Sequence, residues 1–110
     1  MKNNHIILGK IYCIENLTNI YDELSSLDFD KTVSKEISRL DEDLLQLTFS
    51  DGVIIDIGWY PSFDEKGEFI LQVIHDNDWE KPSLKISSGW NKNDLIEKLS
   101  MLLKQKNLVI

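Results

Sequence analysis

Apolar and polar side chains alternate most regularly in the middle of the chain. Residues 45–49 read Leu-Gln-Leu-Thr-Phe, and residues 53–59 read Val-Ile-Ile-Asp-Ile-Gly-Trp. In each run every second residue is large and apolar, and this period of two is typical of a β-strand with one face in the core. The pattern predicts two strands joined by Asp51-Gly52, a dipeptide that favours a tight hairpin turn.

The length of this hairpin loop decides which faces meet. A two-residue turn would pair Leu47 with Asp56, which places an acid on the more apolar face. A three-residue loop over 50–52, with Gly52 in the left-handed conformation, pairs Leu47 with Ile55 instead. Because a slip of one residue inverts a whole face of a strand, we predict the three-residue loop.

The N-terminal half contains three further apolar runs. Residues 6–14 predict one buried strand, in which Cys13 would be a small core residue. The next run has the spacing of an amphipathic helix that Asn16 can cap, with its stripe at Leu17, Ile20, Tyr21, Leu24 and Leu27. Residues 33–40 alternate only weakly; we predict a strand there, with a helix as the alternative.

The C-terminal half predicts two more strands and a helix. Residues 68–75 are apolar on both faces and indicate a central strand, whereas residues 84–87 fit a short edge strand. A helix capped by Asn93 follows, with its apolar stripe at Leu95, Ile96, Leu99, Leu102 and Leu103. These elements predict a single α+β domain over residues 1–110: an antiparallel meander sheet of four to six strands, a helix in the N-terminal half and a C-terminal helix.

Acidic and basic residues are distributed unevenly along the chain, and this distribution bears on the function of the domain. Residues 15–80 carry seventeen acidic and four basic side chains, a net charge of −13. Residues 1–14 and 81–110 carry +2 and +4, and the whole chain −7. If the acidic segment forms one side of the domain, its field favours a basic partner and speeds the encounter with it.

Several classes of function fit this composition poorly. The acidic balance and the single arginine argue against direct binding of nucleic acid, which needs clustered Lys and Arg. One cysteine and the lack of a long apolar run indicate a cytoplasmic protein with no membrane segment. We expect no cofactor.

Catalytic and metal-binding patterns are also missing. Cys13, His5 and His75 lie far apart in sequence, and no glycine-rich phosphate loop or zinc-ligand spacing is present. Residues 76–80 alternate oxygen ligands as a calcium loop does, but Lys81 stands where that loop requires glycine. We therefore predict a protein without enzymatic activity, catalytic residues or a metal site.

Aromatic residues beside acids in the predicted turns are the most distinctive local feature. Trp59-Tyr60-Pro61 leads into the acidic loop before residue 68, and Trp79 stands among acids in the loop after residue 75. In a meander these two loops lie at opposite ends of the sheet, and only the sheet face between them can join them. Trp59 is expected in the core and Trp79 over an edge, although Tyr60 or Trp79 could also anchor a protein interface.

Residues 44–103 resemble the small immunity proteins of bacterial contact-dependent growth inhibition systems. The residues that carry the resemblance are the hairpin LTFSDGVIIDIGWYP, the following DEKGEFILQVIHDNDWEKP and the terminal amphipathic helix. The resemblance implies a non-catalytic inhibitor that binds a cognate basic toxin domain, often a nuclease. Its carboxylates would pair with the lysines and arginines that otherwise hold nucleic acid.

The acids and aromatic residues of the hairpin and the two loops are the candidate partner-binding residues: Asp56, Tyr60, Asp64, Glu65, Asp76, Asp78, Trp79 and Glu80. Residues 41–43, Asp-Glu-Asp, could belong to the same face or form only a solvated turn. An acidic interaction or adaptor domain unrelated to toxins is the alternative function, for example one that pairs through an edge strand.

Overall fold

The computed structural model describes residues 2–108 and the side chains of residues 3–105. It is an α+β fold with two antiparallel sheets and two helices. The first sheet is the hairpin of β1 (Lys2–Ile7) and β2 (Lys10–Glu15), and the second is a meander of five strands. The meander consists of β3 (Leu17–Asp22), β4 (Leu45–Phe49), β5 (Ile54–Tyr60), β6 (Glu68–Ile74) and β7 (Leu84–Ser88). The helices are α1 (Val33–Glu36) and α2 (Lys92–Leu108).

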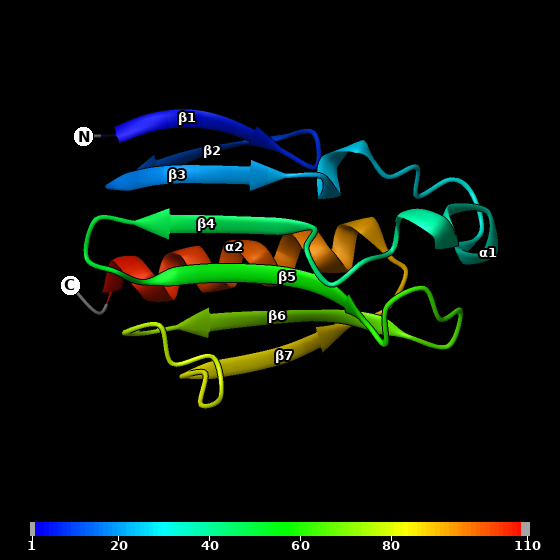
Figure 1. Ribbon diagram of the computed structural model, residues 1–110. Helices are drawn as coiled ribbons and strands as arrows, with labels where there is room; N and C mark the ends of the chain where they lie inside the picture. Colours follow the sequence, from blue (N-terminus) through cyan, green and yellow to red (C-terminus); the bar gives the residue numbers. More distant parts are fainter. Residues whose placement is uncertain (1, 109–110) are drawn as a thin grey trace.

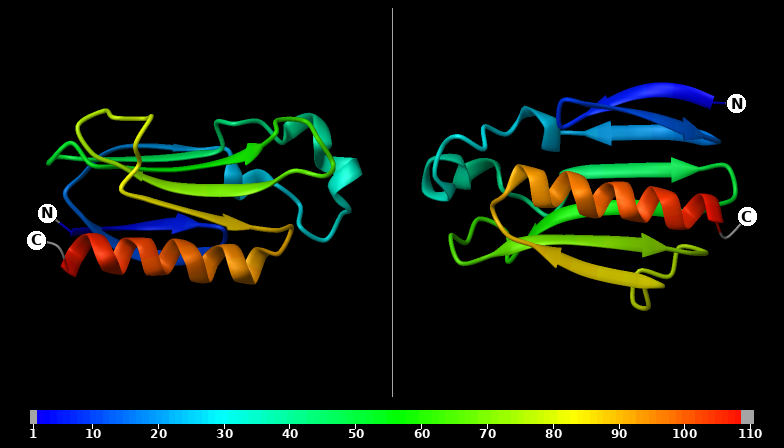
Figure 2. Two further views of the ribbon diagram at one scale, coloured as in Figure 1. Left: turned by 90° about the horizontal axis from the view of Figure 1, so that it is seen from below. Right: turned by 180° about the vertical axis from the view of Figure 1, so that it is seen from behind.

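The fold has two layers, and no helix or strand within residues 2–108 covers the second face of the meander. Helix α2 and the β1–β2 hairpin lie side by side on one face of the five-stranded sheet, as the edge-on view in Figure 2 shows. Inward-facing side chains of β4, β5 and β6 meet the buried leucines of α2 between the layers, where Leu95, Leu99 and Leu102 are at most 1% exposed. The opposite face, turned toward the viewer in Figure 1, is called the open face below.

The central hairpin confirms the predicted loop. Leu47 pairs with Ile55 and Leu45 with Ile57, while the Phe49 amide donates to the carbonyl of Val53 at 2.9 Å. Gly52 has a φ of 85°, the left-handed conformation that the three-residue loop requires. Strand β6 lies between β5 and β7, so the predictions of a central strand and an edge strand are confirmed as well.

Two predictions for residues 6–27 are wrong. Residues 6–14 form two strands, because Leu8 and Gly9 adopt positive φ angles of 55° and 77° and turn the chain back on itself. Cys13 consequently lies on the outer side of the hairpin and is exposed. The helix predicted for residues 17–27 is instead strand β3, which pairs with β4, followed by the short 3₁₀ helix Leu24–Ser26.

The connection from β3 to β4 contains short helical segments, and side chains hold it in place. The strand predicted for residues 33–40 is wrong: these residues form α1 and the 3₁₀ helix Ile37–Arg39, which is the helical alternative. Helix α2 begins one residue before the predicted cap: the side chain of Asn91, not Asn93, accepts the Asp94 amide at 2.9 Å. At this end of the sheet the Trp90 indole donates to the Lys31 carbonyl at 2.8 Å and stacks on Phe29, which fixes the crossover from β3 to α1.

Candidate partner-binding face

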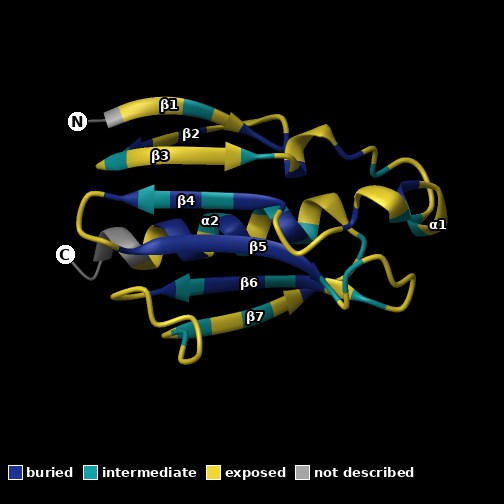
Figure 3. Ribbon diagram, in the orientation of Figure 1, coloured by how far each residue is buried: buried dark blue, intermediate teal, exposed yellow. Residues whose placement is uncertain are grey.

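A row of polar side chains crosses the open face through all five strands of the meander. The strand register places as successive neighbours Tyr21, Gln46, Asp56, Gln72 and Lys85. In β4, β5 and β6 these polar residues alternate with side chains of the core, and Figure 3 shows how much of these central strands is buried. This period of two sets the row on the open side. Asp56, in the central strand, is the middle member and is only 3% exposed.

Three more acids reach this face through a segment that leans on β5. Residues 41–44 extend β4 beyond its regular pairing: the Leu44 amide donates to the Ile57 carbonyl at 3.1 Å, and the Trp59 amide donates to the Asp41 carbonyl at 2.9 Å. Between these two bonds the Glu42 carbonyl passes directly over Gly58, where a Cβ atom would lie 1.9 Å from it. The absence of a side chain at residue 58 therefore allows the Asp-Glu-Asp segment to sit against the sheet.

Burial first, and nearby negative charges second, raise the pKa values of three groups on this face. Burial raises the pKa of Asp56 to about 6; the Asp43 carboxylate adds to this rise, and a hydrogen bond with the Gln46 side chain opposes it. The pKa of Tyr60 is raised by partial burial and then by nearby carboxylates, with Asp56 first among them. The pKa of Tyr21 is also raised, by desolvation and by the negative charges of Glu23 and residues 41 and 43.

Two hollows flank Asp56 on the open face. The first, here called the Tyr21 hollow, has a volume of about 390 Å³ and is lined by Tyr21, Asp43, Leu45, Gln46 and Asp56. The second, the Trp79 hollow, has a volume of about 360 Å³ and is lined by Tyr60, Ile70, Gln72, Trp79 and Lys85. The face is therefore not flat, and each hollow presents an aromatic side chain beside polar groups.

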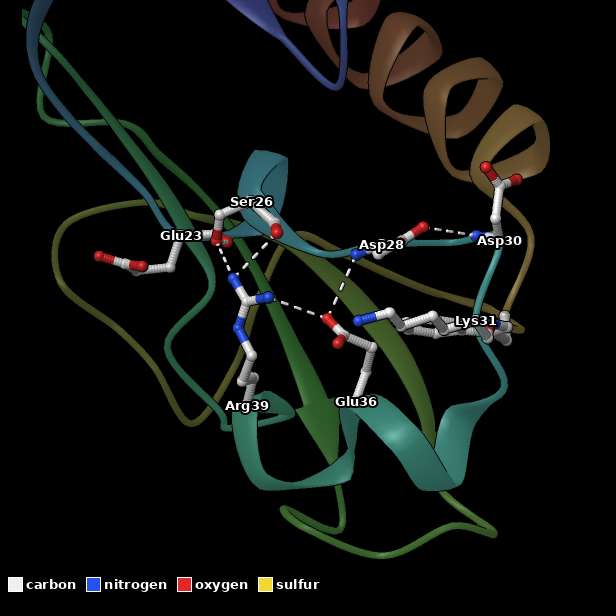
Figure 4. Close-up of polar contacts among 8 residues, drawn as sticks. Glu23, Ser26, Asp28, Asp30, Lys31, Glu36 and Arg39 are labelled. Carbon is white, nitrogen blue, oxygen red and sulfur yellow. Dashed lines mark hydrogen bonds and ion pairs between the residues drawn. The ribbon is translucent and has the colours of Figure 1, made fainter.

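The other buried carboxylate of the chain has a cationic partner. Glu36 is 4% exposed and accepts a hydrogen bond from the Arg39 guanidinium at 2.9 Å and another from the Asp28 amide at 3.2 Å. Arg39 also donates to the carbonyl and the hydroxyl of Ser26 (Figure 4). The only arginine of the chain is thus used to neutralise Glu36 and to hold the crossover. Among the described residues Asp56 has no such ion pair.

The structure brings together some of the predicted site residues and separates others. Asp56 and Tyr60 lie on the open face, and Trp79 reaches the same face from the β6–β7 loop. Asp64 and Glu65 are exposed in the loop at one end of the sheet. The β6–β7 loop, which Figure 1 shows at the other end of the sheet, contains three further acids: Asp76, Asp78 and Glu80. Trp59 is 1% exposed and belongs to the core, as predicted, whereas Trp79 is 44% exposed.

Sequence reasoning missed Tyr21 and Gln46 as members of the face. Tyr21 was assigned to a helix, so no pairing with β4 was expected for it. The Gln46–Asp56 pair, in contrast, follows directly from the predicted hairpin register, in which Leu45 pairs with Ile57 and Leu47 with Ile55. That register was the available signal for Gln46.

A hollow larger than the Tyr21 and Trp79 hollows lies on the other side of the molecule. It has a volume of about 940 Å³ and runs between α2 and β7, past Ile86 and Met101. Two of its charged groups are partners of each other: Lys98 forms an ion pair with Asp94 at 2.9 Å and also donates to the Ser87 carbonyl at 2.6 Å. The side-chain hydrogen bond from Lys98 is the main reason that the pKa of Asp94 is lowered.

Metal and membrane sites find no support among the described residues. Within residues 2–108 no group of three or more His, Cys, Asp or Glu side chains is arranged to hold a metal ion. None of the described helices is long and apolar enough to cross a membrane. Comparison of the chain with protein-family models, with curated proteins and with solved structures finds no match.

Proposed function

We propose that this chain is an immunity protein, a non-catalytic inhibitor that binds a cognate basic toxin domain of the nuclease class on the open face of its sheet. One observation supports the proposal above the rest. Four carboxylates and two tyrosines converge on an uncovered sheet face, and in the described part of the chain none of these carboxylates forms an ion pair. The group consists of Asp41, Glu42, Asp43, Asp56, Tyr21 and Tyr60.

The distribution of charge between the two layers of the fold also supports the proposal. The acidic segment of the sequence supplies β3 to β6 and their loops, while the net positive remainder supplies most of the opposite layer and the edge strand β7. A basic partner is therefore attracted toward the open face and not toward the hairpin and α2. The tyrosines and Trp79 provide the large, partly apolar contacts that usually dominate the energy of a protein interface.

The test is binding to the basic domain encoded by the gene next to this one, prepared as an inactive variant. We expect a dissociation constant in the nanomolar range or below, and an association rate that falls steeply as NaCl rises from about 50 to about 300 mM. Co-expression should also protect cells from the active domain. An association that is absent or indifferent to salt would reject the proposal, and self-association without toxin inhibition would favour the adaptor function.

A matched pair of variants locates the binding face. Asp43→Asn removes one negative charge from the open face, and Glu97→Gln removes one from an exposed position of α2 in the opposite layer. We expect the first change to slow association and the second to leave it within twofold of the wild type. Equal effects of the two variants would show that only total charge matters and that the open face is not the site.

A further inference from the structure

We propose that the Tyr21 hollow is the receptor for a single arginine side chain of the basic partner. The inference rests on the proposed function and makes it more specific, since it names the group that enters the face and the place where it enters. The hollow is defined by its five lining residues, Tyr21, Asp43, Leu45, Gln46 and Asp56, and has a volume of about 390 Å³.

The lining matches the chemistry of a guanidinium group. Asp43 and Asp56 offer carboxylate oxygens from two separate segments, and the amide oxygen of Gln46 can serve as a further acceptor. A guanidinium presents five N–H donors in a rigid planar fork, so it can bond several such oxygens at once. Tyr21 is 45% exposed at the rim and offers its ring to the same cation.

The burial of Asp56 without a cation points to an external one. Its side chain is 3% exposed and lines the hollow, and its one identified side-chain partner is the neutral Gln46. At the other buried carboxylate of this protein, Glu36, an arginine supplies the missing charge from within the chain. At Asp56 the carboxylate of Asp43 adds more negative charge. A partner's arginine would relieve this repulsion, as Arg39 does at Glu36.

The neighbouring Trp79 hollow is a poorer receptor for a cation. Lys85 is part of its lining and repels a second positive group. The Tyr21 hollow has no basic residue in its lining. Because of this difference, we assign the arginine to the Tyr21 hollow and expect apolar contacts in the Trp79 hollow.

The experiment follows the isolated protein by NMR while capped tripeptides are added. The probe is acetyl-Gly-Arg-Gly-amide, and the controls carry citrulline, which has the same shape without the charge, or lysine. We expect saturable shifts of the Gln46 side-chain amide and of the backbone amides of 45, 46 and 56 with the arginine peptide. The lysine peptide should bind several-fold more weakly because its ammonium lacks the planar fork.

Variants and pH separate a specific receptor from general attraction to acids. Asp56→Asn and Asp43→Asn, the latter at an exposed residue, should each lower the affinity for the arginine peptide by about tenfold. This is the usual effect of losing a charge-assisted hydrogen bond. Glu97→Gln should leave the affinity for the arginine peptide unchanged. Lowering the pH from 7.5 to 5.0 should weaken binding to the wild type, because Asp56 is then protonated, but much less so to Asp56→Asn. The other titratable or charged groups on this face are the two tyrosines and the acids of residues 41–43, with Lys85 two strands away from Asp56.

The outcomes distinguish this inference from the proposed function. Equal binding of the citrulline peptide, or shifts spread over the acidic loops with no effect of Asp56→Asn, would overturn the arginine receptor. If the neighbouring gene product still binds the open face in that case, the proposed function stands. The arginine peptide could instead bind the hollow while the neighbouring gene product does not bind the protein. In that case the hollow is an arginine receptor, and the proposed partner is wrong.

Discussion

At the scale of single residues, the buried carboxylates of Glu36 and Asp56 differ in whether a cation neutralises them. Glu36 is hydrogen-bonded to a guanidinium and to a backbone amide, so its charge helps to fix the crossover. Asp56 has a neutral amide as its side-chain partner and lies beside further acids, so its charge costs stability. A loss of folding stability of this kind is tolerated more readily at a functional site than elsewhere, because a bound partner can offset it.

The first prediction follows from the pKa of Asp56, which burial raises from 3.8 to about 6. Between about pH 4 and pH 6 the folded chain keeps a proton that the unfolded chain releases, so the free energy of unfolding falls as pH rises through this window. At about 1.4 kcal/mol per pKa unit this group accounts for about 3 kcal/mol.

Asp56→Asn removes this titration and should stabilise the protein at pH 7.5 by about 2 kcal/mol, an advantage that disappears below pH 4. Urea unfolding followed by tryptophan fluorescence across this pH range measures the difference between the two proteins. Subtracting one curve from the other cancels the titration of the remaining carboxyl groups. Parallel curves would show that Asp56 titrates normally.

The second prediction separates binding from stability at the two tryptophans. Trp79 is 44% exposed, so Trp79→Ala should change the free energy of unfolding by no more than about 0.5 kcal/mol. The same substitution should weaken the partner complex by about 1–3 kcal/mol, because a large aromatic contact is lost. The matched control is Trp59→Phe, which removes the buried bond from the indole to the Asp64 carbonyl at 2.8 Å and should lower stability itself. A Trp79 variant with unchanged affinity would place the interface elsewhere.

At the scale of elements, the success of sequence reasoning depended on whether the deciding signal was local. The β4–β5 hairpin was predictable because alternation and the Asp51-Gly52 turn specify one register. Residues 17–27 were not, because their spacing satisfies a helix, and only pairing with β4 makes residues 17–22 an edge strand. The β1–β2 turn uses Leu8 and Gly9, which lack a strong hairpin signal.

The same distinction applies to the candidate site. Asp56 and Tyr60 could be identified from alternation along one strand. The hollow beside Asp56 could not, because its wall includes Tyr21, which reaches the face only through the edge strand. The position of Asp43 depends on the close passage of residues 41–44 over Gly58, a tertiary contact without a sequence signature.

The third prediction concerns that close passage. Gly58→Ala would place a methyl group 1.9 Å from the Glu42 carbonyl oxygen, so residues 41–44 must move away from β5. We expect a loss of stability of about 1–3 kcal/mol, the usual cost of an overpacked site. Amide shifts of residues 41–44 should change, and affinity for the partner should fall because Asp43 leaves the hollow. The control is Gly89→Ala, where a Cβ atom meets nothing within 4 Å. An unperturbed segment in Gly58→Ala would refute this account of the face.

At the scale of the whole molecule, the sorting of charge between layers has a consequence for stability in the absence of any partner. Carboxylates on the open face repel one another in the folded chain, and no ion pair to the described residues offsets the group formed by Asp41, Glu42, Asp43 and Asp56. Added salt shortens the screening length from about 30 Å at 0.01 M to about 8 Å at 0.15 M, so it should weaken this repulsion. We therefore expect the melting temperature to rise with NaCl over this range.

This last prediction is specific because the repulsion belongs to one face. A variant with Asp41→Asn and Asp43→Asn should be more stable than the wild type at low salt and should gain clearly less from added NaCl. Replacing Glu97 by Gln on α2, together with Glu65→Gln in the exposed β5–β6 loop, removes the same total charge away from the tyrosines and should preserve the wild-type response. Thermal unfolding of the three proteins between 10 and 150 mM NaCl measures these slopes. Equal slopes for the two double variants would mean that the net charge of −7, and not its concentration on the open face, governs the response.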